Sequence, residues 1–164
     1  MGILTSFFNS VRYVRLSPDH LSVRDPKSGK AFSEPPEVAI SLTPKVRIVG
    51  IGVEARMHAT APSVEILNPF AHPRSLVSDF TVGEQLLKAS LARINGGALL
   101  SVAPRVVMHP LGNPAGGFTQ VEIRAFHEMA LGAGAGEVKV WQGRELTDQE
   151  LLSGTFPADG KLLA

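Results

Sequence analysis

The stretch RYVRLSPDHLSVRDP, from Arg12 to Pro26, decides how the rest of the chain is interpreted. Tyr13–Leu16 and His20–Arg24 are short segments typical of strands, and Pro18-Asp19 between them is a turn signal. A second turn follows at Asp25–Lys30. The stretch therefore predicts two neighbouring strands around a tight turn, close to the start of the chain.

The next part of the chain continues as short strands. Glu37–Leu42 and Lys45–Gly50 alternate or cluster β-branched residues, which is typical of strands. Val53–Ala59 has the pattern of a short helix. The segment from Pro62 to Pro73 contains three prolines, so we expect an extended connection there.

The first long helix is introduced by Ser78-Asp79-Phe80-Thr81. Thr81 with Glu84 three residues later matches a capping box, which predicts Thr81 as the N-cap. Asn95-Gly96-Gly97 is a helix stop signal. The expected buried stripe of this helix consists of Leu86, Leu87, Ser90, Leu91 and Ile94.

Two further strands and two further helices follow. Arg105–His109 and Glu137–Trp141 are expected strands, the first stopped by Pro110. Thr119 with Glu122 and Thr147 with Glu150 predict two more capping boxes. A glycine- and proline-rich loop, Leu111–Gly117, connects the strand Arg105–His109 to the helix that begins at Thr119. Gly132–Gly136 ends that helix. Its expected inward residues are Val121, Ala125, Phe126 and Met129. The third helix is expected over Thr147–Leu152.

Composition limits the class of protein. The 164 residues suit a single α/β domain over residues 12–164, with helices packed on a mixed sheet. The 16 basic and 15 acidic residues give a net charge of +1 without a basic block, so we expect no nucleic-acid partner. Cysteine is absent, which excludes disulfides and thiolate metal sites and agrees with a cytoplasmic location.

Residues 1–11 form a candidate amphipathic segment. Ile3, Leu4, Phe7, Phe8 and Val11 share one helical face. Peripheral contact with the inner face of a membrane is one interpretation, although Arg12 is the only nearby cation. The other interpretation is that the segment packs against the core or is disordered, and the sequence favours neither interpretation over the other. Met-Gly-x-x-x-Ser also matches the myristoylation pattern, which matters only in a eukaryotic cell.

With these elements placed, the chain resembles the MreB family of bacterial actin homologues over about residues 6–142. The matching stretches, in order, are FSEPPEVAIS (Phe32–Ser41), VGIGVEARM (Val49–Met57), ILNPF (Ile66–Phe70), LVSDFTVGEQLL (Leu76–Leu87), PRVVMHP (Pro104–Pro110) and TQVEIRAFHEMALGAGAGEVKVW (Thr119–Trp141). The resemblance implies a ribonuclease H-like, actin-type fold, and the predicted order of a hairpin followed by helical crossovers agrees with it.

The departures from the family pattern concern the ATPase site. In the family the first hairpin carries aspartate-leucine-glycine-threonine, which approaches the phosphates and the magnesium ion. Arg15, Leu16, Ser17 and Pro18 occupy that place here. A side chain at Ser17 hinders close approach, Pro18 lacks an N–H donor, and Arg15 replaces a carboxylate with a cation. Gln142–Glu145 replaces a further family element, a glutamate pair followed by proline. We therefore expect a lost site, with no cofactor, no metal and no ATPase activity.

One family catalytic position is kept. Glu122 matches the glutamate that the family uses to position the attacking water, and in this chain it also completes a capping box. An alternative interpretation is a weak nucleotide-binding or hydrolysing protein that uses Glu122 and the Gly112–Gly117 loop. A third is a ligand-binding module built on the long loop beside His109. A second chain that supplies a missing lobe also stays open.

Other patterns are weaker. Gly50–Ala55 matches the G-x-G-x-x-A fingerprint of dinucleotide-binding proteins. That fingerprint also needs an acidic residue at the end of a later strand, and the candidate at the right distance, Asp79, precedes a helix instead. A simple strand-to-helix turn is therefore favoured. A ribonuclease H-type metal cluster could be imagined from Asp79, Glu122 and Glu128. Such a cluster also needs a carboxylate on the first strand, and this chain has Arg15 there, so a metal-dependent nuclease is not expected. A pairing of His109 with His127 lacks a third ligand.

The expected function is therefore non-enzymatic. The resemblance implies a structural or adaptor protein linked to cell shape or cytoskeletal assembly, whose partner is a second copy or an actin-like filament. Trp141, the only tryptophan, is expected in the core rather than at an interface. A half-domain without a second lobe is also expected to leave an unusual face of sheet and helix ends to cover, and self-association through that face is a hypothesis.

Overall fold

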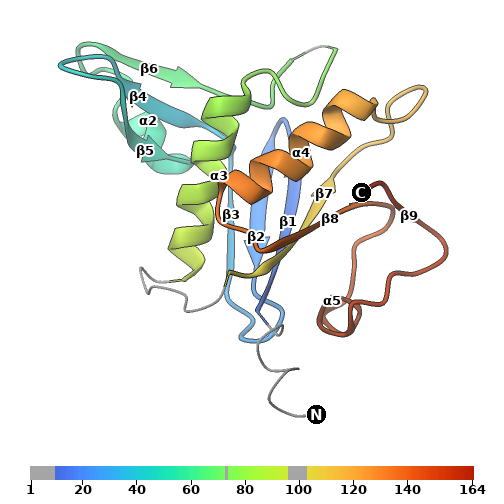
Figure 1. The fold of residues 1–164 in the computed structure, drawn as a ribbon. Coiled ribbons are helices and arrows are strands. Elements are labelled where there is room, and N and C mark those ends of the chain that lie inside the picture. Colours follow the sequence, from blue (N-terminus) through green and yellow to red (C-terminus); the bar gives the residue numbers. More distant parts are fainter. Residues whose placement is uncertain (1–9, 73, 96–102) are drawn as a thin grey trace.

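The computed structural model describes residues 10–72, 74–95 and 103–164 (Figure 1). Its main sheet has six strands in the order β3-β2-β1-β7-β8-β9. Their bounds are β1 Val11–Ser17, β2 His20–Arg24, β3 Ala31–Glu34, β7 Arg105–Pro110, β8 Glu137–Gln142 and β9 Lys161–Leu162. β1, β7 and β8 are parallel to one another, whereas β2, β3 and β9 are antiparallel to their neighbours.

The predicted hairpin lies at the centre of this sheet. Tyr13 pairs with Arg24 and Ser17 with His20, so only Pro18 and Asp19 form the turn. β1 then pairs in parallel with β7, which requires the chain to cross over the sheet between them. Pro110 is the last residue of β7 rather than the residue that stops it, because it pairs with Leu16 at the sheet end.

A second, three-stranded sheet has the order β5-β4-β6. Its strands are β4 (Val38–Ser41), β5 (Arg47–Ile51) and β6 (Val64–Leu67), and the short helix α2 (Val53–Met57) lies beside them. The connection expected from Pro62 to Pro73 contains a strand that the sequence did not predict, since β6 forms there and pairs with β4. Figure 1 shows this sheet at the upper left, beside α3.

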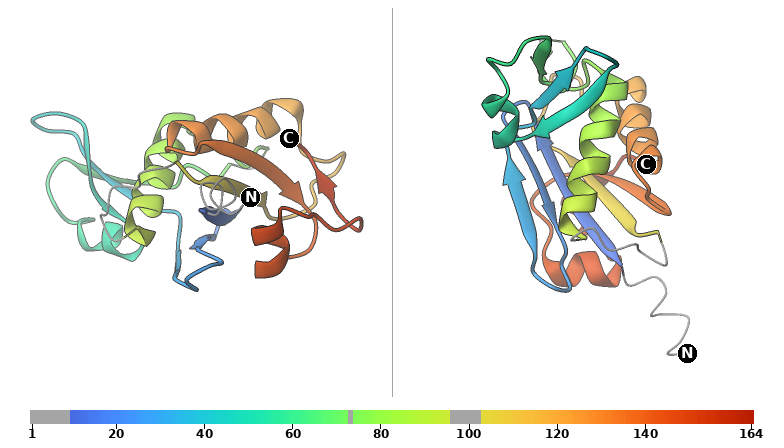
Figure 2. Two further views of the ribbon diagram at one scale, coloured as in Figure 1. Left: turned by 60° about the horizontal axis from the view of Figure 1, so that its bottom comes forward. Right: turned by 90° about the vertical axis from the view of Figure 1, so that its left-hand side faces the viewer.

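Two helices, α3 (Phe80–Ile94) and α4 (Gln120–Gly132), cover one face of the main sheet (Figures 1 and 2). Every member of the stripe predicted for α3 is buried. One core cluster contains residues of both sheets and both helices, among them Val14, Ile51, Leu86 and Phe126. The two sheets therefore share a hydrophobic core.

The opposite face of the main sheet is covered by the chain itself. Helix α5 (Asp148–Ser153) lies on the side of the sheet away from α3 and α4 (Figure 2). A second core cluster is buried beneath it, consisting of Val11, Tyr13, Val107, Trp141, Leu146 and Leu151. This face of the sheet is therefore covered, and Trp141 is a core residue as expected.

Local signals set most helix starts. The boxes of Thr119 with Glu122 and of Thr147 with Glu150 are both formed, as predicted. The box predicted at Thr81 was wrong: the N-cap of α3 is Asp79, whose carboxylate accepts a hydrogen bond from the Val82 N–H at 3.0 Å. Asp79 lies two residues before Thr81, and its carboxylate accepts from a backbone N–H of the first helical turn that has no acceptor within the helix.

Two further residue placements differ from the sequence prediction. Val121 is 80% exposed rather than inward, because the buried side of α4 passes through Glu122, Phe126, Met129 and Ala130. Val11 begins β1 and is buried, so it does not belong to a separate N-terminal helix. The membrane face proposed for Ile3, Leu4, Phe7 and Phe8 lies outside the described residues.

Candidate functional site

The β1–β2 turn is the position where the family approaches phosphate. Pro18 offers no backbone N–H, and the exposed Asp19 adds a carboxylate beside it. The Pro18 carbonyl accepts a hydrogen bond from the side-chain amide of Asn68 at 2.8 Å. A phosphate cradle requires converging N–H donors and a positive field, and this turn supplies a carbonyl and a negative charge instead.

Arg15 pairs with a residue outside that turn. Its guanidinium lies 3.4 Å from the carboxylate of Glu145, in the segment after β8. The side chain is 31% exposed and lies on the face of β1 that also carries Tyr13, since alternate residues of a strand share a face. The cation that replaces the family carboxylate therefore pairs with a carboxylate beside α5.

A cleft of about 440 Å³ nevertheless lies next to the turn. Its walls bring together Pro18, the Gly112–Gly117 loop and the start of α4 at Thr119 and Glu122, with Arg74 as the cation among its lining residues. The structure thus gathers the elements that the nucleotide-binding alternative requires. Asp79 and Arg15 are not among its lining residues.

The Glu122 carboxylate is already engaged by the protein. One oxygen accepts hydrogen bonds from the Thr119 N–H and hydroxyl, both at 3.0 Å. The other accepts from the Leu76 N–H at 3.1 Å, which ties the connection before α3 to the start of α4. Burial raises the pKa of Glu122, the hydrogen bonds from Thr119 and Leu76 lower it, and the result is a pKa below the ordinary value. Glu122 is therefore an ionised structural acceptor.

Tyr13 and His109 form a buried pair that was not predicted from the sequence. The Tyr13 hydroxyl lies 2.6 Å from His109 Nδ1, and His109 Nε2 lies 2.9 Å from the Gly143 carbonyl. A carbonyl can only accept, so Nε2 carries the proton and Nδ1 accepts from Tyr13. The Tyr13 oxygen in turn accepts from the Leu146 N–H at 3.1 Å.

Burial is the main cause that lowers the pKa of His109, to about 4. His109 and His127 do not form the pair considered from the sequence, because His109 is satisfied by Tyr13 and Gly143. No sequence signal pointed to Tyr13, since its proximity to His109 depends on the parallel register of β1 and β7.

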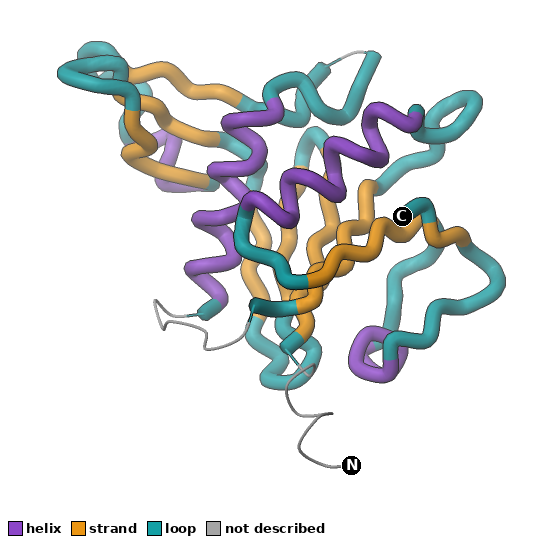
Figure 3. Tube along the Cα trace, in the orientation of Figure 1, coloured by secondary structure: helices purple, strands orange, loops and turns teal. Residues whose placement is uncertain are grey.

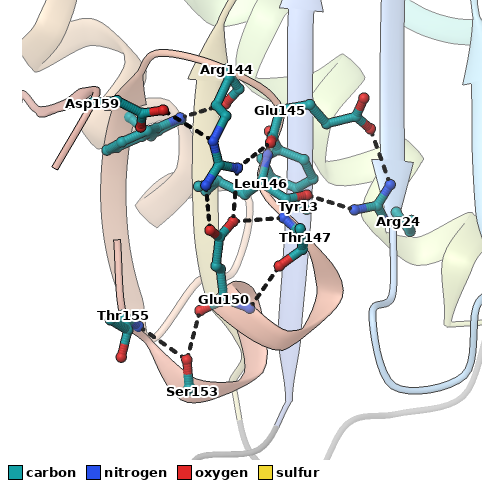
Figure 4. A network of polar contacts seen from close by, with 11 residues as sticks. Tyr13, Arg24, Arg144, Glu145, Leu146, Thr147, Glu150, Ser153, Thr155 and Asp159 are labelled. Carbon is teal, nitrogen blue, oxygen red and sulfur yellow. Dashed lines mark hydrogen bonds and ion pairs between the residues drawn. The ribbon is translucent and has the colours of Figure 1, made fainter. Parts of the chain in front are cut away.

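Figure 4 shows how the segment after β8 is fastened to the sheet. The Arg24 guanidinium lies 3.2 Å from Glu145 and 3.1 Å from Asp148, and donates to the Leu146 carbonyl at 3.2 Å. Arg144 pairs with Glu150, the glutamate of the capping box at the start of α5. These contacts explain why residues 143–150 are held against the second face.

The remaining sequence candidates have structural roles. At the G-x-G-x-x-A stretch, the Glu34 carboxylate accepts from the Val53 N–H at 3.2 Å, and a Cβ added at Gly52 would overlap it. A carboxylate therefore occupies the position where a dinucleotide phosphate would bind, which agrees with the predicted strand-to-helix turn. Within the described residues no three carboxylate or histidine side chains gather as metal ligands, and Asp79, Glu122 and Glu128 form no such cluster. Among the described helices, none has the length and apolarity needed to span a bilayer.

Comparison with known proteins agrees with this fold. The family model MreB/Mbl protein matches residues 21–146, a match that begins just after the Pro18-Asp19 turn. The cell shape-determining protein MreB of Haemophilus influenzae is 33% identical over 117 residues, 68% of this chain and 32% of that protein. That of Escherichia coli K12 is 33% identical over 116 residues, 67% of this chain and 31% of that protein. The chain thus spans about a third of the length of these relatives.

Solved structures show the same fold. MreB5 of Spiroplasma citri bound to ADP superposes with a TM-score of 0.63 at 18% identity, covering 82% of this chain and 38% of that one. A non-polymerising MamK mutant bound to AMPPNP gives a TM-score of 0.65 at 14% identity, covering 82% and 41%. The fold is therefore actin-like, with the ribonuclease H-like arrangement predicted from the sequence. Taken with the family match over residues 21–146, these likenesses show that the chain belongs to the MreB/Mbl family.

Proposed function

We propose that this protein is a non-catalytic, MreB-like structural or adaptor protein that acts in cell shape or cytoskeletal assembly. The observation that carries the proposal is the chemistry of the β1–β2 turn. Pro18 removes a donor, its carbonyl is bonded to Asn68, and Arg15 is paired with Glu145. A phosphate group at this position would meet the Pro18 carbonyl and the Asp19 carboxylate, while the Arg15 cation is already paired with Glu145.

The state of Glu122 supports the same proposal. Both oxygens of Glu122 accept hydrogen bonds, one from Thr119 and the other from Leu76. These bonds complete the N-cap of α4 and tie the connection before α3 to it, so the retention of Glu122 has a structural reason.

The partner that we propose is another actin-type protein, either a second copy or a filament of a longer relative. The curated relatives are named cell shape-determining proteins, and the chain spans about a third of their length. We place the protein in the cytoplasm, at the inner face of the membrane if the N-terminal segment binds lipid. The balanced net charge of +1 favours no nucleic-acid partner.

A specific observation favours a second candidate, weak nucleotide binding. The cleft of about 440 Å³ contains Pro18, Glu122 and the Gly112–Gly117 loop, and Arg74 provides a cation. Proteins of similar fold have been solved with ADP and with AMPPNP. In this candidate, phosphate would contact the glycine-rich loop rather than the hairpin turn.

Calorimetric titration with magnesium-ATP, with phosphate release followed in the same sample, separates the two candidates. Because Pro18 removes a donor from the turn and Glu122 serves as a capping acceptor, we expect neither saturable heat nor release above the buffer rate. Glu122→Gln and Glu128→Gln serve as a matched pair, since Glu128 is exposed on the same helix. Hydrolysis that Glu122→Gln abolishes and Glu128→Gln keeps would overturn the non-catalytic proposal, and saturable binding alone would overturn the loss of the nucleotide site.

A further inference from the structure

The outer edge of β3 is one end of the main sheet. β3 is the first strand in the order β3-β2-β1-β7-β8-β9, and its inner edge pairs with β2. It lies beside α3, at the outer side of the sheet (Figures 1 and 3). Among residues 10–72, 74–95 and 103–164, no strand pairs with its outer edge. An edge of this kind is a template for another strand.

The backbone groups that point out of this edge can be assigned. The Lys30 carbonyl accepts a hydrogen bond from the Asp25 N–H at 2.8 Å, so it points toward β2. In an antiparallel pair, alternate residues bond to the partner strand, and the β2–β3 register contains no shift. Phe32 and Glu34 therefore bond to β2, whereas the N–H and C=O groups of residues 31 and 33 point outward. In the part of the chain that the structure describes, these outward groups have no hydrogen-bond partner.

The charges along β3 make its edge complementary to itself. Lys30 stands just before the strand and Glu34 ends it, each two residues from Phe32. Two copies that lie antiparallel with Phe32 opposite Phe32 therefore place each Lys30 opposite Glu34 of the other copy. Opposite charges across neighbouring strands attract, whereas an edge with like charges at both ends would repel an antiparallel copy.

The same register uses the outward backbone groups. With Phe32 at the centre, Ala31 of each copy lies opposite Ser33 of the other, and the N–H and C=O of both residues are paired. A shift of two residues in either direction leaves one such pair within β3 and separates the charges. A shift of one residue places outward groups opposite groups that already bond to β2. The backbone and the charges thus select one register.

A depression of about 280 Å³ lies beside this edge and is lined by Lys30, Ala31, Phe32, Arg93 and Ile94. Its charged residues are both cations, and the guanidinium carbon of Arg93 lies 4.9 Å from the centroid of the Phe32 ring. In the selected register, Glu34 of the second copy approaches this depression beside Lys30. Glu34 also lies 3.4 Å from Arg93 of its own chain, and a carboxylate has acceptor sites for both cations.

We propose that the chain forms a two-fold dimer in which the β3 edges of two copies pair antiparallel about Phe32. The two main sheets then continue as one, through an interface that uses the same surface of both copies. The inference rests on the proposed adaptor role, whose partner it names as a second copy. A monomer would overturn the dimer and leave the nucleotide titration unaffected, whereas ATP hydrolysis would overturn the non-catalytic proposal and leave the dimer.

Cysteine cross-linking tests the register, because the chain contains no cysteine. Ala31 and Ser33 are both exposed, and the dimer places them opposite each other at a Cα separation of about 5.5 Å, which a disulfide can bridge. When Ala31→Cys and Ser33→Cys are mixed under mild oxidation, we expect the disulfide between the two variants to exceed both symmetric disulfides. Statistical yields, or an excess of either symmetric disulfide, would overturn the proposed pairing.

Charge variants test the complementarity. Lys30→Glu places a glutamate opposite Glu34 in both halves of the dimer, so we expect the concentration of half-dissociation in sedimentation to rise about tenfold or more. Lys27→Glu is the matched control, because Lys27 is exposed in the turn before β3 and the charge change is the same. It should dimerise as wild type does, and high salt should partly restore the Lys30→Glu dimer.

Fluorescence of Trp141 shows whether each variant is folded, since the tryptophan is buried in the cluster that does not contain Phe32. A wild-type chain that stays monomeric at millimolar concentration would overturn the inference. Folded Lys30→Glu that dimerises as strongly as wild type and Lys27→Glu would overturn it as well.

Discussion

At the scale of single residues, His109 is constrained by hydrogen bonds at both ring nitrogens. Its Nε2 must donate to Gly143 and its Nδ1 must accept from Tyr13, so a second ring proton would meet a hydroxyl that already accepts from Leu146. Among the charged groups, Arg15 lowers its pKa and Glu145 raises it, while burial has the largest effect. The native state therefore holds His109 neutral.

This constraint predicts how stability depends on pH. The folded pKa of His109 is about 4 and the ordinary value is 6.5, so the unfolded chain binds the proton first as pH falls. The contribution to the free energy of unfolding is fully present above pH 6.5 and declines toward pH 4, by about 2 kcal/mol between pH 7 and pH 5. Urea unfolding at several pH values measures it.

His109→Gln is the informative variant, since an amide can accept from Tyr13 and donate to Gly143 without titrating. We expect its stability to be nearly flat over the same pH interval. The carboxylates with lowered pKa, such as Glu122 and Asp25, titrate below their ordinary values and do not mask the effect. An unchanged slope in His109→Gln would assign the dependence to another group.

At the scale of elements, capping chemistry was predictable where one candidate stood alone. Thr119 and Thr147 each have a glutamate three residues later and no competing cap, and both boxes form. Before α3, Asp79 and Thr81 both have suitable side chains. Asp79 caps the helix through Val82, whereas Glu84 lies against Gly132 of α4, where an added Cβ would overlap its carboxylate. Tertiary packing decided between two equal local signals.

The corrected start of α3 makes a direct prediction. Asp79→Ala removes the acceptor for the Val82 N–H, so we expect a loss of about 1 kcal/mol in the free energy of unfolding. Thr81→Ala lies two residues further along, at an exposed position, and should change stability by less than about 0.5 kcal/mol. Equal losses in the two variants, measured by urea unfolding, would contradict the assignment of Asp79 as the cap.

The difference between local signals and tertiary packing also explains which features of the candidate site were predictable from the sequence and which were not. The altered turn and the capping role of Glu122 depend on neighbours within a few residues, and both were predictable from the sequence. The Tyr13–His109 pair joins residues 96 apart, and its contact depends on strand register. Val121 was predicted to face the core but is exposed, because an apolar residue near a helix start does not determine which side of the first turn is buried.

At the scale of the whole molecule, the question is whether the two sheets fold as one unit. Ile51 of the small sheet and Phe126 of α4 belong to a single core cluster. The second cluster, under α5, contains Trp141 and is separated from the first by the main sheet. A shared core and a central sheet that contributes to both clusters predict cooperative unfolding over residues 12–164.

Ile51→Ala tests this coupling from the side remote from the tryptophan. Ile51 is 5% exposed, so the truncation should cost about 2–4 kcal/mol. Because Trp141 lies in the other cluster, its fluorescence should respond only if the two sheets unfold together. We expect the urea midpoints from tryptophan fluorescence and far-ultraviolet circular dichroism to fall by the same amount, whereas Val46→Ala, at a 72% exposed position, should leave both nearly unchanged. A fluorescence transition that stays in place while the dichroism becomes biphasic would show that the three-stranded sheet unfolds on its own.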